Sequence, residues 1–305
     1  MPFARYRHSA AFVNGKLYVI GGRTLDEPTY DELAKEIHVY DPKDGENGSW
    51  KLFMTLTDEH TVSDQTSFAK DGSIYILGGY QGNGDGYTTR DELISLNVET
   101  KEILPLASMI TKRGDASAAY YNSGGIEAIY IMGGFTSKTN FCEPLSEAEK
   151  YDFATNKWTT ISPLVQERGD KGVVVLNDHI LAIGGEDKHE SICAGTDEGV
   201  DPSSHAIAVN DVESYNPQDG DDAKWEVEVD FNEFRFRSAA AVAKNLDTVF
   251  LFGGQMAFSD ECNCYKTSKD IFYYREKHSH PNSSSGRKIS IAIAIVASLV
   301  TLFIV

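Results

Sequence analysis

The sequence predicts an all-β protein built from five copies of one antiparallel sheet unit. An apolar run that ends in Gly-Gly recurs five times, with the Gly pairs beginning at positions 21, 78, 133, 184 and 253. Each run follows a small or apolar strand and a turn and precedes a polar loop, and in the first four units the next strand ends near Asp or Asn. One such sheet cannot bury both of its faces alone, whereas sheets stacked around an axis can. The repeat therefore predicts a β-propeller.

The first unit shows the order of the strands most clearly. Residues 8–13 (HSAAFV) read as an inner strand, and Asn14-Gly15 is a two-residue hairpin signal before the strand that ends at the first Gly pair. A third strand ends in VYDP at 39–42. The fourth strand is expected to carry a tryptophan in three of the units, at Trp50, Trp158 and Trp225. Each blade should therefore be a four-stranded antiparallel sheet.

This combination of motifs resembles the kelch-repeat family, from residue 5 to residue 274. In that family a hydrophobic run, Gly-Gly, Tyr and Trp stand at set distances in blades of ~50 residues. The resemblance implies a kelch-type β-propeller with blades at about 5–58, 59–110, 111–164, 165–233 and 234–275. It also implies structural roles for the repeated residues. The glycines should stand where a Cβ has no room, and the Trp and Tyr rings should fill the wedge between blades.

The two ends depart from the repeat. The fifth unit closes at 270–280 (DIFYYREKHSH) without a following Trp strand, so we expect the fifth blade to lack its fourth strand. The chain opens on MPFARYRHSAA, which reads like the linker out of a fourth strand. We expect a preceding strand or blade to be missing from this sequence. The alternative is a five-bladed ring that closes imperfectly.

The tail has the composition of a membrane segment. A polar linker at 276–288 precedes 289–305, which are 17 residues without a charge. As a helix they would extend ~25 Å, near the lower limit for crossing a bilayer. A GPI-type signal, a tail anchor with a cytosolic propeller, and a single-pass anchor with an extracellular or lumenal propeller all fit. We expect the propeller to lie on the extracellular or lumenal side, which either a GPI-type signal or a single-pass anchor would give, with glycosylation candidates at Asn47 and Asn282.

The four cysteines all lie in the loops that follow the Gly pairs: Cys142, Cys193, Cys262 and Cys264. We expect at least one disulfide, joining loops of neighbouring blades. A direct Cys262–Cys264 bond is disfavoured because only one residue separates them.

Charged residues also repeat where each blade begins. Arginines align at one position, Arg5, Arg113, Arg168 and Arg235, and two residues later stand Arg7, Asp115, Asp170 and Arg237, with Asp64 in or beside the same place. In a propeller this linker lies on one face near the channel mouth. The residues could contact a polar partner, or they could form salt bridges that only hold neighbouring blades together.

The remaining chemistry points to binding. A net charge of −18 argues against a nucleic-acid partner. Asp197, Asp201 and His205 form only a weak candidate metal set, and we find no catalytic constellation and expect no cofactor. The sequence therefore predicts a non-enzymatic, membrane-tethered module that presents one loop face to a protein or glycan partner. The alternative is a carbohydrate-active or metal-dependent oxidoreductase that uses the channel mouth.

Overall fold

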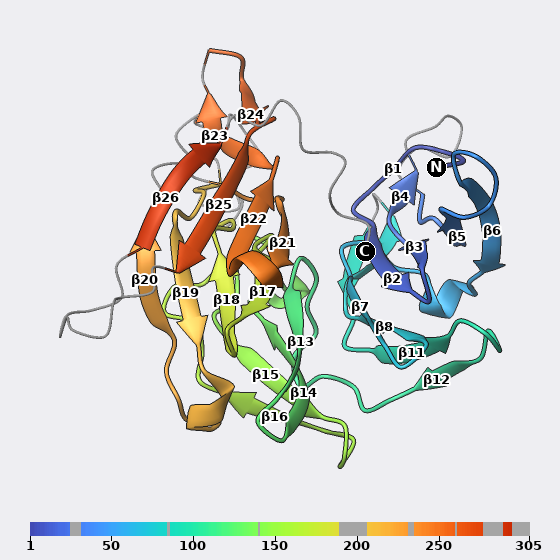
Figure 1. Cartoon of the computed structure of the whole chain (residues 1–305), viewed down its shortest axis with the longest axis horizontal. Helices are drawn as coiled ribbons and strands as arrows, with labels where there is room; N and C mark the ends of the chain where they lie inside the picture. Colours follow the sequence, from blue (N-terminus) through green and yellow to red (C-terminus); the bar gives the residue numbers. More distant parts are fainter. Residues whose placement is uncertain are drawn as a thin grey trace.

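Five four-stranded antiparallel sheets make up the computed structural model of the chain (Figure 1). The structure describes residues 1–24, 32–83, 86–139, 141–188, 206–230, 235–259, 261–276 and 289–294. The predicted all-β architecture with five propeller blades is confirmed.

In each blade the four strands follow one another in chain order from the inner to the outer edge of the sheet. Blade one contains β2 (Ser9–Val13), β3 (Lys16–Ile20), β5 (Glu36–Asp41) and β6 (Ser49–Thr55). Blade two contains β7 (Thr66–Lys70), β8 (Ser73–Leu77), β11 (Leu93–Asn97) and β12 (Ile103–Pro105). Blade three contains β13 (Ser117–Ser123), β14 (Ile126–Met132), β15 (Ala148–Asp152) and β16 (Lys157–Ile161). Blade four contains β17 (Gly172–Leu176), β18 (His179–Ile183), β19 (Asp211–Tyr215) and β20 (Glu226–Asp230). Blade five contains β21 (Ala239–Ala243), β22 (Thr248–Phe252), β25 (Ile271–Glu276) and β26 (Ile289–Ala294).

The loops between the strands of the blades contain short strand pairs and 3-10 turns. The pairs are β1 (Arg5–Tyr6) with β4 (Arg23–Thr24), β9 (Tyr80–Asn83) with β10 (Gly86–Thr89), and β23 (Gln255–Ser259) with β24 (Cys264–Thr267). The turns are η1 (Asp58–His60), η2 (Ser137–Thr139), η4 (Pro217–Asp219) and η5 (Lys244–Leu246).

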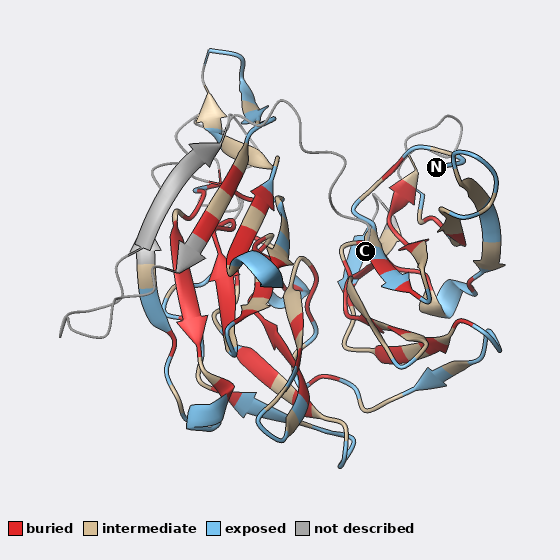
Figure 2. Ribbon diagram, viewed as in Figure 1, coloured by how far each residue is buried: buried red, intermediate tan, exposed pale blue. Residues whose placement is uncertain are grey.

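The inner strands gather around the middle of the molecule and the outer strands form its periphery (Figure 1). Consecutive inner strands contact one another from β2 through β7, β13 and β17 to β21. The second and third strands of the blades hold most of the buried strand residues, as in β14, β18 and β19, whereas an outer strand such as β12 is largely exposed (Figure 2). The blades are therefore arranged radially, with their edges at the rim.

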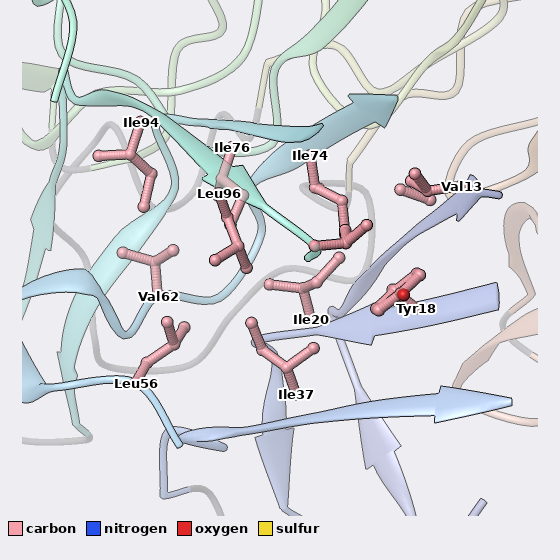
Figure 3. Close-up of a cluster of buried hydrophobic side chains, with 12 residues drawn as sticks. Val13, Tyr18, Ile20, Ile37, Leu56, Val62, Ile74, Ile76, Ile94 and Leu96 are labelled. Carbon is pink, nitrogen blue, oxygen red and sulfur yellow. The ribbon is translucent and has the colours of Figure 1, made fainter. Parts of the chain in front are cut away.

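Apolar side chains fill the space between neighbouring blades. Figure 3 shows the cluster between blades one and two. Blade one contributes Val13, Tyr18, Ile20 and Ile37, blade two contributes Ile74, Ile76, Ile94 and Leu96, and Leu56 and Val62 of the connecting segment complete the cluster. Burying a side chain of this size contributes roughly 1.5–3 kcal/mol. Two of the three tryptophans also bridge blades, because the indole N–H of Trp158 donates to Ala107 O at 2.7 Å and that of Trp225 to Ser162 O at 3.1 Å.

The Gly pairs form the tightest contact between blades. In blades one to four, the N–H of the second glycine donates to a carbonyl of the next blade's entry linker, over 3.0, 2.9, 3.0 and 2.8 Å: Gly22 to Val62, Gly79 to Arg113, Gly134 to Arg168 and Gly185 to Arg235. The first glycine adopts a left-handed φ near 60°, and a Cβ there would come within 2.2 to 2.6 Å of the same carbonyl oxygen. Glycine is therefore required on steric grounds.

The structure corrects two expectations about the C-terminal part. Blade five does not lack its fourth strand, because β26 pairs antiparallel with β25 from Ile271↔Ala294 to Glu276↔Ile289. The predicted membrane helix over 289–305 accordingly begins as a strand, since an uninterrupted apolar run suits either conformation. Residues 295–305 lie outside the described part of the chain, within which no helix is long and apolar enough to span a bilayer.

Replacing the first glycine of a pair should cost more where a following blade is packed against it. We expect Gly133→Ala to lower the free energy of unfolding strongly, because the new Cβ would meet Arg168 O at 2.2 Å in addition to the strain of φ +60°. The matched control is Gly253→Ala, where φ is +58° and the nearest atom lies at 3.4 Å. Denaturant titration of both variants measures the difference, and equal losses would contradict the steric account.

Candidate binding site at the centre of the propeller

The arginines at the first repeated position are buried. The Arg113 guanidinium donates to Gly133 O at 3.0 Å and Glu147 O at 2.8 Å, and it pairs with the Glu149 carboxylate at 2.6 Å. Arg168 repeats this pattern one blade later with Gly184 O and Glu213. Each of these guanidinium groups therefore joins the end of the second strand of its blade to the third strand.

The other two arginines of this set are buried in equivalent places. Arg5 donates to Gly21 O at 3.2 Å and Glu36 O at 2.9 Å, and the guanidinium of Arg235 lies 4.6 Å from the centre of the Phe272 ring. Because all four side chains bind inside their own blades, they do not reach the channel mouth. This placement corrects the expectation that they contact a partner or link neighbouring blades by salt bridges.

The residues at the second repeated position lie together at the centre, and we call them the central arc: Arg7, Asp64, Asp115, Asp170 and Arg237. All five adopt left-handed φ values, between 49° and 57°. Their backbones are bonded in series, because the N–H of each donates to the carbonyl of the one before it, over 2.9, 3.1, 2.9 and 2.8 Å. The structure thus brings together Arg7, Asp115, Asp170 and Arg237, and it places Asp64 in the same register.

Two cavities meet at the central arc. One, of 640 Å³, runs along the inner strands and is lined by Gln65, Ser117 and Lys171, among others. The second, of 290 Å³, opens on the side of the loops that follow the Gly pairs, and we call it the mouth pocket. Four residues of the central arc line both: Arg7, Asp64, Asp115 and Arg237.

The exposed charge of the central arc is positive. Arg7 pairs with Asp64 at 3.0 Å, and Arg237 pairs with Asp170 at 2.8 Å and with Glu186 at 3.2 Å. The two arginine side chains are 38% and 40% exposed, whereas those of Asp64, Asp170 and Glu186 are between 2% and 15% exposed. A ligand entering the mouth pocket therefore meets guanidinium groups with the carboxylates beneath them.

The carboxyl groups of the arc differ in ionisation. Burial, with Asp170 and Asp64 beside it, raises the pKa of Asp115 well above its ordinary value, and Tyr80 Oη donates to it at 2.8 Å. Burial also raises the pKa of Asp64. Burial opposes the charge of Asp170 as well, but the neighbouring Arg237 outweighs it and the pKa is lowered. Asp115 is thus the carboxyl group of the central arc that resists ionisation most strongly.

Aromatic rings form the walls of the mouth pocket. Tyr80 and Phe141 meet edge to face at 5.4 Å, and the Arg23 guanidinium lies 4.5 Å from the centre of the Tyr87 ring. Arg23 is held below the surface by Ser63 Oγ at 3.1 Å and Gly82 O at 3.2 Å. Sequence reasoning missed these residues, although one signal was present. The position just after each Gly pair points toward the centre, where it holds Arg23, Tyr80, Phe135, Glu186 and Gln255.

One disulfide differs from the prediction. Cys262 and Cys264 are bonded to each other, with Cα atoms 5.2 Å apart. Asn263 adopts φ +49°, and this left-handed turn brings the two Cα atoms within bonding range across a single residue. Cys142 is also disulfide-bonded, and Cys193 lies outside the described residues.

The remaining candidates contribute nothing to the centre. Asp197, Asp201, His205 and Asn282 lie outside the described residues, and Asn47 is exposed on the loop before β6. Within the ranges that the structure describes, no three His, Cys, Asp or Glu residues are placed to hold a metal ion.

Comparison with known proteins identifies the family. Residues 1–185 match the KLHDC2/KLHL20/DRC7 Kelch-repeats domain, so the chain belongs to the kelch-repeat family. Human Kelch-like protein 23 is 28% identical over 225 residues, which are 73% of this chain and 33% of that protein. Kelch-like protein terF of Aspergillus terreus is 26% identical over 192 residues, 61% of this chain and 39% of that protein. The chain thus spans between about a third and two fifths of the length of these relatives.

A solved structure shares the fold. The chain titled "Structure of YjhT" superposes with a TM-score of 0.74 at 16% identity, covering 94% of this chain and 84% of that one. At this identity the likeness concerns the fold alone.

Two amide substitutions in the central arc should change stability in opposite directions. Because the pKa of Asp115 is raised in the folded state, its ionisation opposes folding once the pH exceeds the unfolded value of about 3.9. Asp115→Asn should therefore raise the free energy of unfolding at pH 7, and the gain should vanish near pH 3.

Asp170→Asn is the matched variant, because the pKa of Asp170 is lowered and its ion pair with Arg237 stabilises the fold above about pH 3.9. It should cost roughly 1.5–3 kcal/mol at pH 7 and less as the pH falls. Urea titrations at several pH values measure both effects. A loss of stability for Asp115→Asn at pH 7 would contradict the assigned ionisation.

Proposed function

We propose that this kelch-repeat chain is a non-enzymatic protein-binding module whose mouth pocket receives an acidic side chain of its partner. The observation that carries the proposal is the pair of exposed guanidinium groups, Arg7 and Arg237, between the aromatic walls of the pocket. Asp64 and Asp170 lie beneath these two groups and position them, Asp64 by its ion pair with Arg7 and Asp170 by its ion pair with Arg237.

The size and composition of the pocket favour a protein partner. Its volume of 290 Å³ lies just below the range for pockets that hold drug-sized ligands, about 300–1,000 Å³, and suits one or two side chains. Tyrosine and arginine, which line it, are the residues that most often dominate binding at protein interfaces. The stacked blades supply a rigid frame, so little conformational entropy is lost on binding.

The charge pattern favours an acidic contact residue. A carboxylate accepts two parallel hydrogen bonds from a guanidinium, and such bonds are stronger than those between neutral groups. The chain as a whole carries a net charge of −18, so an acidic segment is repelled by most of the surface and is attracted only at the pocket. Electrostatics would thus fix where the partner docks more than how tightly it binds.

Selection of peptides on the immobilised protein tests the proposal. We expect peptides enriched in Asp or Glu beside an apolar residue, with an affinity that falls as salt rises. Tyr87→Ala removes a wall of the pocket and should weaken binding at least tenfold, which corresponds to about 1.4 kcal/mol. Arg7→Ala should weaken binding of acidic peptides and have less effect on their neutral analogues.

The control is Leu104→Ala on β12, which removes a side chain that is 57% exposed on an outer strand. It should leave the affinity unchanged. Selected peptides without acidic residues, or equal affinity for wild type and Tyr87→Ala, would rule out the mouth pocket as the binding site.

A further inference from the structure

The Cys262–Cys264 disulfide lies at the surface, in the hairpin that β23 and β24 form. Both cysteines are exposed, and so is Asn263 between them. Cys264 begins β24 and pairs with Ser259, the last residue of β23, so the bond stands at the turn of the hairpin. A thiol in solution can therefore reach this disulfide while the blades remain packed.

Cys142 provides a contrast within the same chain. It is also disulfide-bonded, but it is only 4% exposed. Thiol–disulfide exchange requires a thiolate to reach a sulfur atom, so its rate depends on access, and exposed disulfides are the ones that exchange most readily. The two environments therefore predict different reactivity toward the same thiol.

The Cys262–Cys264 bond is poorly placed to stabilise the fold. It spans a single residue, and the entropy that a disulfide removes from the unfolded chain grows with the length of the loop that it closes. It also requires Asn263 to adopt a left-handed φ of +49°. A bond that served stability alone would join segments far apart in the sequence, so the position of this one indicates another role.

The hairpin that carries the bond contacts blade four and the central arc. The ring of Tyr265, next to Cys264, packs edge to face on Phe236 with ring centres 5.3 Å apart. Its hydroxyl accepts a hydrogen bond from Ala206 N–H at 2.7 Å, in the loop between β18 and β19. Phe236 is buried and immediately precedes Arg237. The placement of Tyr265 thus couples the hairpin to two other parts of the molecule.

We propose that the Cys262–Cys264 disulfide is a thiol–disulfide exchange site, which thiols in solution reduce while the blades stay folded, and whose opening loosens the bond between Tyr265 and Ala206. Once the disulfide is open, Asn263 is no longer held at a left-handed φ, and the turn that aligns β24 with β23 is released.

The exchange proceeds in two steps. A thiolate attacks one sulfur atom of the pair, a new S–S bond forms, and the electron pair of the broken bond leaves on the other cysteine, which takes up a proton. A second thiolate then attacks the reductant's sulfur in this mixed disulfide and releases the first cysteine, which is protonated in turn. The chain gains two electrons and two protons, and the reductant becomes a disulfide.

Alkylation of the folded chain tests the site. The protein is incubated with increasing dithiothreitol or glutathione, free thiols are blocked with iodoacetamide, and peptide mass spectrometry locates the labels. Cys262 and Cys264 should be labelled at reductant concentrations at least about tenfold below those that label Cys142, with the circular dichroism spectrum unchanged. Labelling in both arms assigns the site to thiols in general, and labelling in dithiothreitol alone assigns it to dithiols.

Amide hydrogen exchange measures the effect of opening. The Ala206 N–H should exchange at least about tenfold faster in the reduced chain, because its acceptor on Tyr265 is no longer held in place. The double variant Cys262→Ser/Cys264→Ser should exchange as the reduced chain does, whether or not reductant is present. Tyr265→Phe is the matched control, because it removes the acceptor oxygen and leaves the disulfide. It should show fast Ala206 exchange in both redox states.

Three results would overturn the proposal. The two cysteines could be labelled only together with Cys142 or only after the fold is lost, which would make the bond a structural one. Peptides of the untreated protein could show Cys262 or Cys264 as a free thiol or joined to another cysteine. The Ala206 N–H could exchange equally fast in the oxidised and reduced chains, which would mean that the hairpin does not respond to its disulfide.

Discussion

The structure depends on backbone hydrogen bonds that pass from one blade to the next at the centre of the molecule. Each junction between neighbouring blades contains two of them, one from the Gly pair and one between residues of the central arc. Both require unusual backbone geometry, since the glycines and the five arc residues all have positive φ. A single bond of this kind contributes only about 0.5–1.5 kcal/mol, but the pair fixes the distance at which apolar faces such as those of Figure 3 can pack.

The same geometry creates the site. Each residue of the central arc stands two residues before an inner strand and has a left-handed φ. This conformation turns its side chain away from that strand, so the five side chains gather around one centre. Asp and Asn tolerate this conformation better than most residues, which accounts for aspartate at three of the five positions. Neighbouring carboxylates repel one another when all of them are ionised. The raised pKa of Asp115 reduces this repulsion, and Arg7 and Arg237 at the two ends of the central arc offset it through their ion pairs with Asp64 and Asp170.

Much of the fold could be predicted from the sequence because the Gly pairs mark steric contacts that no other residue can make. The arginines were harder. Arg113 and Arg168 stand two residues before members of the central arc, and their sequence suggests surface charges. In the fold each guanidinium is buried, where it donates to backbone carbonyl groups and to a glutamate on the third strand of its blade, more than 30 residues along the chain. Only the folded blade shows those partners. The β26 strand was missed because a continuous apolar run carries no period. The Cys262–Cys264 bond was missed because a one-residue spacing is unfavourable for a disulfide unless the intervening residue adopts a left-handed φ, as Asn263 does.

Amide hydrogen exchange tests the account most directly, because it measures each of the inter-blade bonds separately. The N–H groups of Asp64, Asp115, Asp170 and Arg237, and those of Gly22, Gly79, Gly134 and Gly185, should exchange slowly, as part of the last structure to open. The N–H groups of Arg7 and Gly254 have no backbone acceptor on a neighbouring blade among the described residues, and they should exchange orders of magnitude faster. Equal protection at all ten positions would contradict the open arrangement of the blades.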